Sequence, residues 1–223
     1  MPPAKTRGKR PPLSRERVVA AGVELADAEG AEALSMRKLA QSLGVEAMSL
    51  YHHVANKDEL LDGMVDVVFA EVHLPVAEGP WQAEVRARCT SMHEVLLRHP
   101  WAVGRLNSRR TPGMATLLHH DAVIGCLRAG GFSVRAAASA FATLDAYVYG
   151  FVLQELALPV ELDEQPGDLA EEILGNLPEG ALPHLTEMAM AYITREDYAF
   201  ANEFEPGLDL ILDGLDRLRR AQT

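Results

Sequence analysis

The stretch MRKLAQSLGVEAMSLYHHVA, residues 36–55, has the spacing of a helix-turn-helix. Two crossing helices need a small side chain where they meet, and Ala40 supplies it. The turn needs a residue that readily adopts positive φ, and Gly44 follows four positions later. Val45 and Leu50 are apolar where the second helix must pack on the first. Because the second helix of such a motif enters the major groove, the stretch predicts an element that reads double-stranded DNA.

Capping signals predict helices on both sides of this motif. Ser14 is a candidate N-cap for a helix that Gly30 ends. Asn56, with Glu59 three positions later, resembles a capping box and begins a helix predicted over residues 56–73. Because this helix starts directly behind the helix-turn-helix, it links that motif to the rest of the chain.

The rest of the sequence keeps helical spacing, and no stretch alternates with the period of two that marks a half-buried strand. Further helices are predicted at 81–98, 102–106, 113–129, 134–158, 185–192 and 206–220. The other residues between 160 and 205 include many acids, prolines and glycines, and they are predicted to form a loop. The expected fold class is all-α.

The net charge of −11 at pH 7, taken whole, argues against a nucleic-acid partner, because such a partner requires its phosphates to be neutralised. The distribution of the charge indicates the opposite. Residues 1–57 hold nine Lys and Arg against six Asp and Glu, whereas residues 58–223 hold twelve against 26. A short basic N-terminal part and a long acidic remainder indicate two functions. The acidic remainder should repel DNA and so confine DNA contact to the N-terminal part.

Several classes of protein find little support. Cys89 and Cys126 form no Cys-x-x-Cys pair and are expected to be buried, reduced thiols. No uninterrupted apolar stretch approaches the roughly 18–20 residues that span a bilayer. The apolar run behind the basic N-terminus is too short for a signal peptide. The chain is therefore expected in the cytoplasm, with no membrane partner.

No enzyme is predicted, because the sequence lacks a Gly-x-Ser-x-Gly elbow, a phosphate-binding glycine loop and a His-Glu-x-x-His motif. The candidates for a metal site are the run His119, His120 and Asp121, and the pair His93 and His99. Adjacent histidines on a helix point about 100° apart and are poor co-ligands. We therefore expect surface histidines, and no metal or cofactor.

Residues 34–64, LSMRKLAQSLGVEAMSLYHHVANKDELLDGM, resemble the DNA-binding domain of the TetR family of repressors, and most closely that of its tetracycline-repressor branch. Further likeness follows in order along the chain at Trp81-Gln82, Leu96-Leu97-x-His99 and Gly131-Phe132-Ser133. The basic charges and prolines at the N-terminus indicate a basic flexible arm (1–13). The resemblance implies a three-helix helix-turn-helix DNA-binding domain (14–60) and a larger helical ligand-binding and dimerisation domain (61–223). It also implies a homodimer that binds a palindromic operator and releases it when a small-molecule effector binds.

Carried over residue by residue, the resemblance assigns DNA contacts to the helix-turn-helix. Arg37 falls where the family places a base-reading arginine, and a guanidinium on guanine O6 and N7 gives about 1–3 kcal/mol of discrimination. Ala47 and Met48 occupy the base-facing start of the recognition helix, where an apolar side chain meets a thymine methyl. The other expected contacts, to phosphates or base edges, are Ser35, Lys38, Ser49, Tyr51, His52, His53 and Lys57.

Plainer interpretations of some of these residues stay open. Tyr51 has the spacing of a core residue, Arg37 and Lys38 could be solvated charges, and His52 faces either the groove or solvent. The basic arm either contacts phosphates and the minor groove or serves only solubility, and the neighbouring helix-turn-helix favours contact.

The implied effector pocket combines apolar side chains with a few polar ones. Its expected residues are His73, Arg88, Met92, Leu106, Arg109, Leu117 and Tyr147. Each of them could equally belong to the core or the surface. Leu106 stands where the tetracycline repressor has a metal-binding histidine, so a magnesium–tetracycline complex is not expected. The set suits an apolar ligand that bears a carbonyl, phenol or carboxylate.

The helices at 134–158 and 206–220 carry more apolar surface than one core needs, and they are assigned to a four-helix dimer interface. Two other functions stay open. One is a small-molecule-binding protein or enzyme with a vestigial helix-turn-helix, which would show turnover without operator binding. The other is a ligand-dependent activator of the same family.

Overall fold

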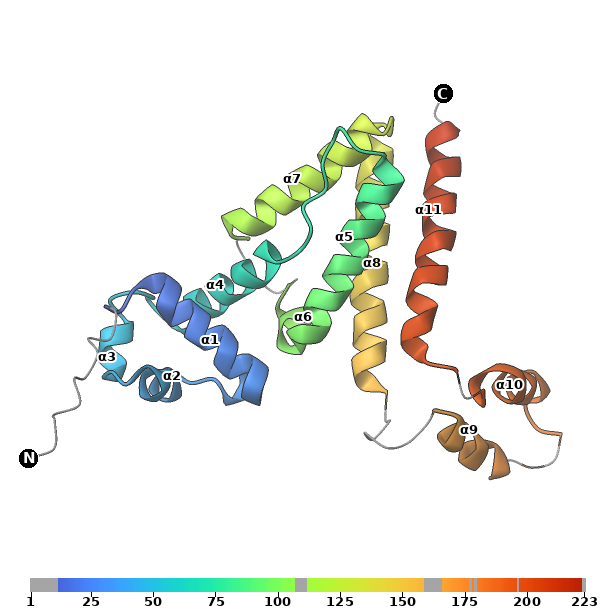
Figure 1. Cartoon of the computed structure of the whole chain (residues 1–223), viewed down its shortest axis with the longest axis horizontal. Helices are drawn as coiled ribbons and strands as arrows, with labels where there is room; N and C mark the ends of the chain where they lie inside the picture. The colour runs from blue at the N-terminus through green and yellow to red at the C-terminus, as the bar shows by residue number, and fades with distance from the viewer. Residues whose placement is uncertain are drawn as a thin grey trace, which may run out of the picture. The chain divides into compact units, whose positions relative to one another are not determined.

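The structure is a computed structural model, and it describes residues 12–106, 112–158, 166–176, 178, 180–195 and 197–221. Every regular element in these residues is a helix (Figure 1), so the predicted all-α fold class is confirmed. By their contacts the residues form two compact units. Unit 1 comprises Met1–Val72 and Arg98–His120, and unit 2 comprises His73–Leu97 and Asp121–Thr223.

Unit 1 opens with the elements of the helix-turn-helix region. They are α1 (Arg15–Glu29), the short 3₁₀ helix η1 (Ala31–Ala33), α2 (Met36–Leu43), α3 (Ala47–Leu50) and α4 (Lys57–Ala70). The predicted N-caps Ser14 and Asn56 are confirmed, because each side chain accepts a hydrogen bond from a backbone N–H three residues on. Ser35 caps α2 in the same way. Gly44 ends α2 with a φ of 68°, the left-handed conformation that the turn requires.

The ends of two helices bear on the site. The recognition helix α3 ends at Leu50, and a turn follows it, so Tyr51 lies just beyond the helix. The helix α4 ends at Ala70 instead of continuing to His73. Its last N–H groups bond three residues back, from Glu71 to Val68 and from Val72 to Phe69, and this tighter pattern ends the α-helix.

A continuous apolar core holds the helix-turn-helix in place. Ala40, as predicted, is buried where the helices cross, and Leu50 pins α3 to the same core. The helices α1 and α4 approach closely at Gly22, where an added Cβ would lie 2.9 Å from the Met64 sulfur. The other fully buried members of this core include Val18, Leu39 and Leu60.

Unit 1 also contains α6 (Pro100–Leu106) and the first part of α7 (Met114–Ala129). The predicted piece at 102–106 begins earlier, at Pro100, because proline fits the first turn of a helix, where its missing N–H leaves no bond unmade. The contacts thus place residues 98–120 in the same unit as the helix-turn-helix region. The predicted domains instead divide the chain by task, with DNA binding in 14–60 and ligand binding and dimerisation in 61–223. That division by task stays a prediction.

Unit 2 is built mainly from α5 (Trp81–Arg98), α8 (Val134–Ala157) and α11 (Phe204–Arg220). Each lies within two residues of its predicted range. Ser133 caps α8 by accepting a hydrogen bond from the Ala136 N–H. By length and composition α8 could cross a membrane, with a mean hydropathy of 1.4, but core helices of soluble proteins pass the same test.

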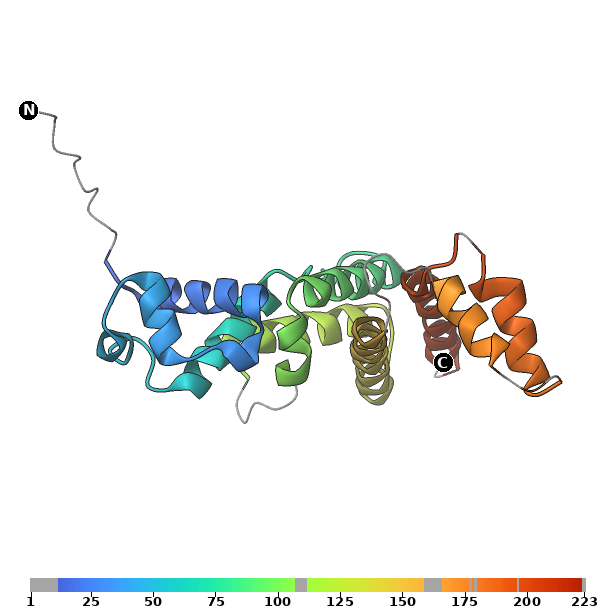
Figure 2. The ribbon, with the colours of Figure 1, turned by 90° about the horizontal axis from the view of Figure 1, so that it is seen from below.

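The region 160–205 holds more helix than predicted. Besides α10 (Pro183–Met188) and the π-helical turn η2 (Ala189–Ile193), which match the expected helix near 185–192, it contains α9 (Pro166–Gly175) and η3 (Phe200–Glu203). Figure 2 shows α9 and α10 side by side. The helix α9 packs against η2. Because this tertiary contact stabilises α9, the spacing of residues within its own acidic segment does not predict the helix.

Candidate DNA-reading and effector sites

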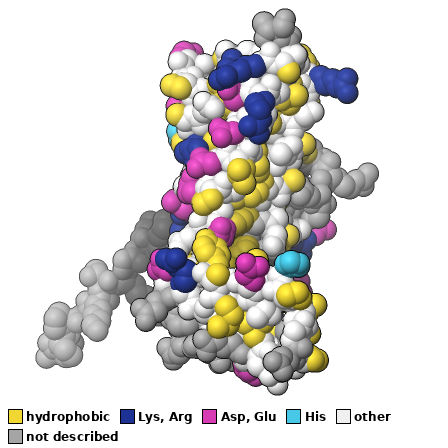
Figure 3. Space-filling view, turned by 90° about the vertical axis from the view of Figure 1, so that its right-hand side faces the viewer, with side chains coloured by type: hydrophobic (Ala, Val, Ile, Leu, Met, Phe, Trp, Pro, Cys, Tyr) yellow, Lys and Arg dark blue, Asp and Glu magenta, His cyan; other side chains and the backbone are white. Residues whose placement is uncertain are grey.

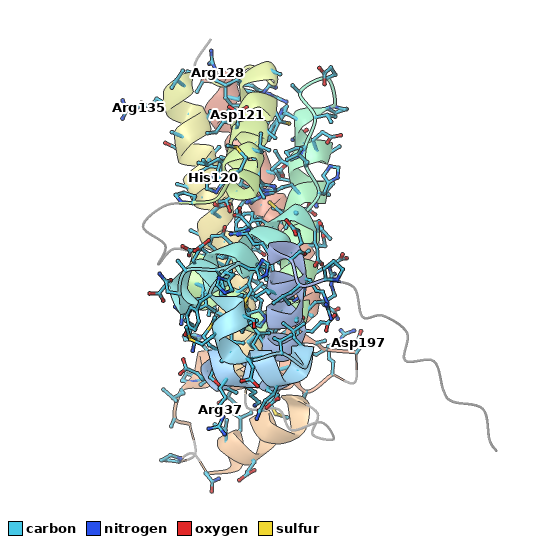
Figure 4. All side chains as sticks on the ribbon, turned by 90° about the vertical axis from the view of Figure 1, so that its left-hand side faces the viewer. Arg37, His120, Asp121, Arg128, Arg135 and Asp197 are labelled. Carbon is cyan, nitrogen blue, oxygen red and sulfur yellow. The ribbon has the colours of Figure 1, made fainter. Side chains whose placement is uncertain are left out.

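The exposed side of the helix-turn-helix carries the residues that were expected to read bases. Arg37 projects from α2 into solvent (Figure 4), and Met48 at the start of α3 is 73% exposed. Tyr51 is 43% exposed, so its ring does not belong to the core. His52 beside it is exposed as well. These side chains together present a cation, an apolar group and an aromatic hydroxyl on the motif.

Ala47 and Met48 do not occupy equivalent positions. Ala47 is half-buried and packs against the core of the helix-turn-helix, whereas Met48 is among the most exposed large apolar side chains of the described residues. At the base-facing start of the recognition helix, Met48 is therefore the side chain with the greater reach.

The residues expected to contact phosphates are held by local interactions. The Ser35 hydroxyl accepts a hydrogen bond from the Lys38 N–H at 3.2 Å, and as an O–H donor it still has its proton to give. The Lys38 ammonium pairs with the Glu29 carboxylate at the end of α1. The side chains of the remaining candidates are half-buried: Ser49, His53 and Lys57.

The expected effector residues are divided between the units. Leu106 and Leu117 belong to unit 1, and His73, Arg88, Met92 and Tyr147 belong to unit 2. Arg88 and Met92 are buried, Tyr147 and Leu106 are half-buried, and His73 and Leu117 are exposed. Arg109 lies outside the described residues. Their assembly into one pocket stays a prediction.

Arg88 is a charged side chain in the core of unit 2. It is 0% exposed, and its Nη2 lies 2.6 Å from Oδ1 of Asp145 on α8. Burial alone would lower the pKa of Arg88, but the Asp145 carboxylate, together with Cys89 and Tyr149, outweighs burial and raises the pKa. Tyr149 donates a hydrogen bond to Asp145 Oδ2 at 3.5 Å, and burial, followed by the charge of Asp145, raises the Tyr149 pKa. Unit 2 thus keeps an ion pair away from water.

His73 begins unit 2 with polar contacts of its own. Its Nε2 lies 3.1 Å from Oε2 of Glu84, and its backbone N–H donates to the Ser91 hydroxyl at 3.0 Å. The pKa of Glu84 is lowered, first by a hydrogen bond from the Val76 N–H and then by one from His73. The imidazole is thereby held against a carboxylate at the edge of unit 2.

Three histidines expected on the surface are buried instead, which corrects the prediction: His93, His99 and His119. His93 stacks on Phe204 at a centroid distance of 4.2 Å and lies 2.7 Å from Glu155. His119 meets Phe69 edge to face. Their partners lie far away in sequence, so only the helical spacing of His93 from the buried Cys89 and Leu96 could have indicated a buried face.

A cavity of about 230 Å³ lies in unit 2, in a segment that the sequence predicted to be mostly loop. It is lined by Tyr192, Arg195, Asp197, Tyr198, Asn202 and Glu203. None of the expected effector residues lines it. In the part of the chain that the structure describes, no group of three or more His, Cys, Asp or Glu side chains is placed to hold a metal ion.

Comparison with known proteins identifies the class of this protein. Residues 18–64 match the family model of bacterial regulatory proteins of the tetR family, and residues 74–219 match the tetracyclin repressor-like C-terminal domain. The chain belongs to the TetR family. Its relatives are named as regulators and repressors of transcription rather than as enzymes.

Particular relatives refine this placement. An HTH-type transcriptional regulator of Saccharopolyspora erythraea is 41% identical over 154 residues, which is 69% of this chain and 65% of that protein. The class A tetracycline repressor from transposon 1721 of Escherichia coli is 30% identical over 93% of this chain and 92% of its own. The crystal structure of ActR of Streptomyces coelicolor in complex with actinorhodin superposes with a TM-score of 0.79 at 31% identity, over 94% of this chain and 99% of that one. The match thus spans less than two thirds of the first of these relatives.

Proposed function

We propose that this chain is a sequence-specific transcriptional repressor that binds a palindromic operator as a homodimer and leaves it when a small molecule binds. The observation that carries the proposal is the exposure of Arg37, Met48 and Tyr51 together on a capped helix-turn-helix whose opposite face is buried. Because its partner is chromosomal DNA, the protein acts in the cytoplasm.

The residues of the helix-turn-helix region have different roles in DNA recognition. Arg37 reads a guanine, and Met48 contacts a thymine methyl, since an apolar side chain offers no hydrogen bond to a base edge. Ser35, Ser49, Tyr51 and Lys57 contact phosphates and set the register on the duplex. Lys38 contributes less, because its ammonium is already paired with Glu29.

The effector is an apolar molecule with a few polar groups. The candidate residues in unit 2 are the half-buried Tyr147, the buried Met92 and the ion pair of Arg88 with Asp145. The ActR structure with bound actinorhodin supports an effector of this kind for a relative of the same fold. Leu106 cannot ligate a metal, so the effector enters without magnesium.

The dimer forms through the outer faces of α8 and α11. Figure 3 looks onto the face that carries α11 and shows hydrophobic side chains running along it. Leu210 on α11 is 74% exposed, and Leu153 and Leu156 on α8 are exposed as well. Pairing these helices about a twofold axis buries apolar surface that would otherwise face water, and it matches the symmetry of a palindrome.

Release follows from the spacing of the two recognition helices. They must lie about 34–36 Å apart to enter successive major grooves. The linking helix α4 begins beside the recognition helix, so a ligand that favours another position of α4 spoils that spacing. Full switching requires the effector to prefer the released state by about 5.5 kcal/mol.

A mobility-shift assay tests the proposal with duplexes from the region upstream of the protein's own gene. We expect retardation of one duplex that survives excess unrelated DNA, and release by actinorhodin, the compound bound in the ActR structure. Tetracycline with Mg²⁺ is the matched comparison and should leave the complex intact. Retardation of all duplexes alike would contradict the proposed function, and retention in the presence of every aromatic compound tested would contradict its effector class.

A further inference from the structure

His99 contacts the C-terminal ends of α1 and α4, two helices of the DNA-reading region. Its Nδ1 lies 2.7 Å from Asp27 on the last turn of α1, and its Nε2 lies 3.3 Å from Glu71 at the end of α4. The histidine is only 7% exposed. Each ring nitrogen of His99 therefore faces a carboxylate, and the two carboxylates come from different helices.

The neighbours of His99 reinforce both attachments. The Trp101 indole N–H donates to the same Asp27 oxygen at 2.7 Å, and Arg98 donates to Glu71 at 2.8 Å. Burial would raise the pKa of Glu71, but hydrogen bonds from Arg98 and His99 outweigh it and lower the pKa. The carboxylates at the C-terminal ends of α1 and α4 are thus both contacted by one short segment.

This segment comes from a different part of the family architecture. Asp27 lies in the stretch 18–64 that matches the N-terminal family model, whereas His99 and Trp101 lie in the stretch 74–219 that matches the C-terminal one. All of these residues belong to unit 1. The clamp, as we call residues 98–101 with Asp27 and Glu71, therefore connects the two family domains inside one compact body.

The clamp bears on DNA reading because α1 and α4 carry the recognition helix. They cross at Gly22 and Met64, and α3 is packed into the same core through Leu50. Holding the far ends of α1 and α4 together fixes their crossing angle. That angle in turn sets where α3 presents Met48 and Tyr51.

We propose that His99 and Trp101 are positioning residues for operator recognition, acting through Asp27 and Glu71 without touching DNA. The proposal rests on the function proposed above. A phosphate-driven, sequence-independent contact tolerates small changes in the angle of the recognition helix, whereas bidentate contact with a base does not. The clamp therefore governs the preference for operator over unrelated DNA rather than affinity in general.

The test compares Asp27→Ala with Glu24→Ala in the full-length protein. Both substitutions remove one acid from α1, but Glu24 is exposed and lies outside the clamp. Anisotropy titrations use an operator duplex and a scrambled duplex of equal length. Because Asp27→Ala loses charge-assisted hydrogen bonds, we expect it to bind the operator about tenfold more weakly than Glu24→Ala does. The two variants should bind the scrambled duplex equally well. A merely unstable variant would instead lose both affinities in proportion.

A second variant, Trp101→Phe, removes the indole N–H and keeps an aromatic ring at this position. It tests the proposal if Asp27→Ala does not fold. A wild-type ratio of operator to scrambled affinity in Trp101→Phe would overturn the proposal. If the wild-type protein itself prefers no sequence, the proposed function fails instead. Hydrogen exchange then tests the clamp alone: faster exchange at the last turns of α1 and α4 in Trp101→Phe supports it, and unchanged exchange overturns it.

Discussion

The guanidinium of Arg88 lies 2.6 Å from the carboxylate of Asp145, inside unit 2, with side-chain exposures of 1% and 14%. An ion pair in this setting costs desolvation energy on both sides, so it adds little net stability compared with a well-packed apolar pair. Removing either partner, however, leaves the other as a buried charge without its counter-ion. The ion pair also places charge among the residues expected to meet the effector.

Replacing Arg88 by methionine leaves the Asp145 charge buried without its partner. We expect the free energy of unfolding to fall by about 3–5 kcal/mol, measured by urea denaturation at pH 7. The double variant Arg88→Met with Asp145→Leu removes both charges and should recover most of that loss. A double variant as unstable as the single one would show that shape, rather than charge, decides stability here.

Tyr147 predicts an alkaline limit to stability. Burial, followed by the charge of Glu205, raises its pKa to about 12, and its hydroxyl donates to the Phe204 carbonyl oxygen at 2.7 Å. An unfolded tyrosine ionises near pH 10, at about its usual pKa, so the contribution of Tyr147 is complete below that pH and is lost as the pH rises towards 12. The stability difference between wild type and Tyr147→Phe should be constant up to about pH 10 and shrink above it. A difference independent of pH would contradict this assignment.

Ser35 combines a cap with an expected phosphate contact, and two substitutions separate these roles. Ser35→Ala loses the cap on α2 and should lower the free energy of unfolding by about 1 kcal/mol. Ser35→Asp keeps the cap but places a negative charge where a phosphate is expected, so it should stay stable and bind DNA worse than Ser35→Ala. Thermal unfolding and anisotropy measure the two effects. Equal DNA affinity of the two variants would argue against a phosphate at this position.

Arg37 and Lys57 should affect DNA binding in different ways. Arg37→Ala should cost about 1–3 kcal/mol at one base pair and leave other positions of the operator unaffected. Lys57→Ala should weaken binding to all sequences and lower the slope of log affinity against log salt by about one. Binding to a set of single-base operator variants at several salt concentrations separates the two. Uniform, sequence-independent losses from both variants would contradict this division of roles.

Leu210 tests the dimer interface. It is 74% exposed on α11, and an aspartate there would place a charge in the proposed four-helix contact. Leu210→Asp should sediment as a monomer at micromolar concentration and lose operator affinity. The matched control is Leu185→Asp, a change of the same kind at an exposed leucine of α10. If the control dissociates and Leu210→Asp does not, the interface lies elsewhere.

Much of the fold could be predicted because its signals are local. Ser14, Ser35 and Asn56 cap helices that begin at the next residue, and Gly44 makes the turn where its positive φ is needed. Capping depends on neighbours within four residues, so a single sequence contains the information. The DNA-reading residues were assigned through the resemblance to the TetR family, and the structure shows that Arg37, Met48 and Tyr51 among them are exposed.

The missing parts depend on contacts between distant residues. His99 was expected on the surface, but its partners Asp27 and Glu71 lie 72 and 28 residues away. Arg88 was proposed as a pocket residue without any indication that Asp145 pairs with it. Pairings of this kind arise only when helices pack, so a periodic pattern along one helix does not reveal them.

The central claim is that this chain reads a particular DNA sequence with twofold symmetry. Selection of bound duplexes from a random pool by the full-length protein tests that claim most directly. We predict enrichment of a palindrome whose half-sites are centred about one helical turn, or roughly 10–10.5 base pairs, or a multiple of it apart. Enrichment of no sequence, or of a single half-site without symmetry, would contradict the account.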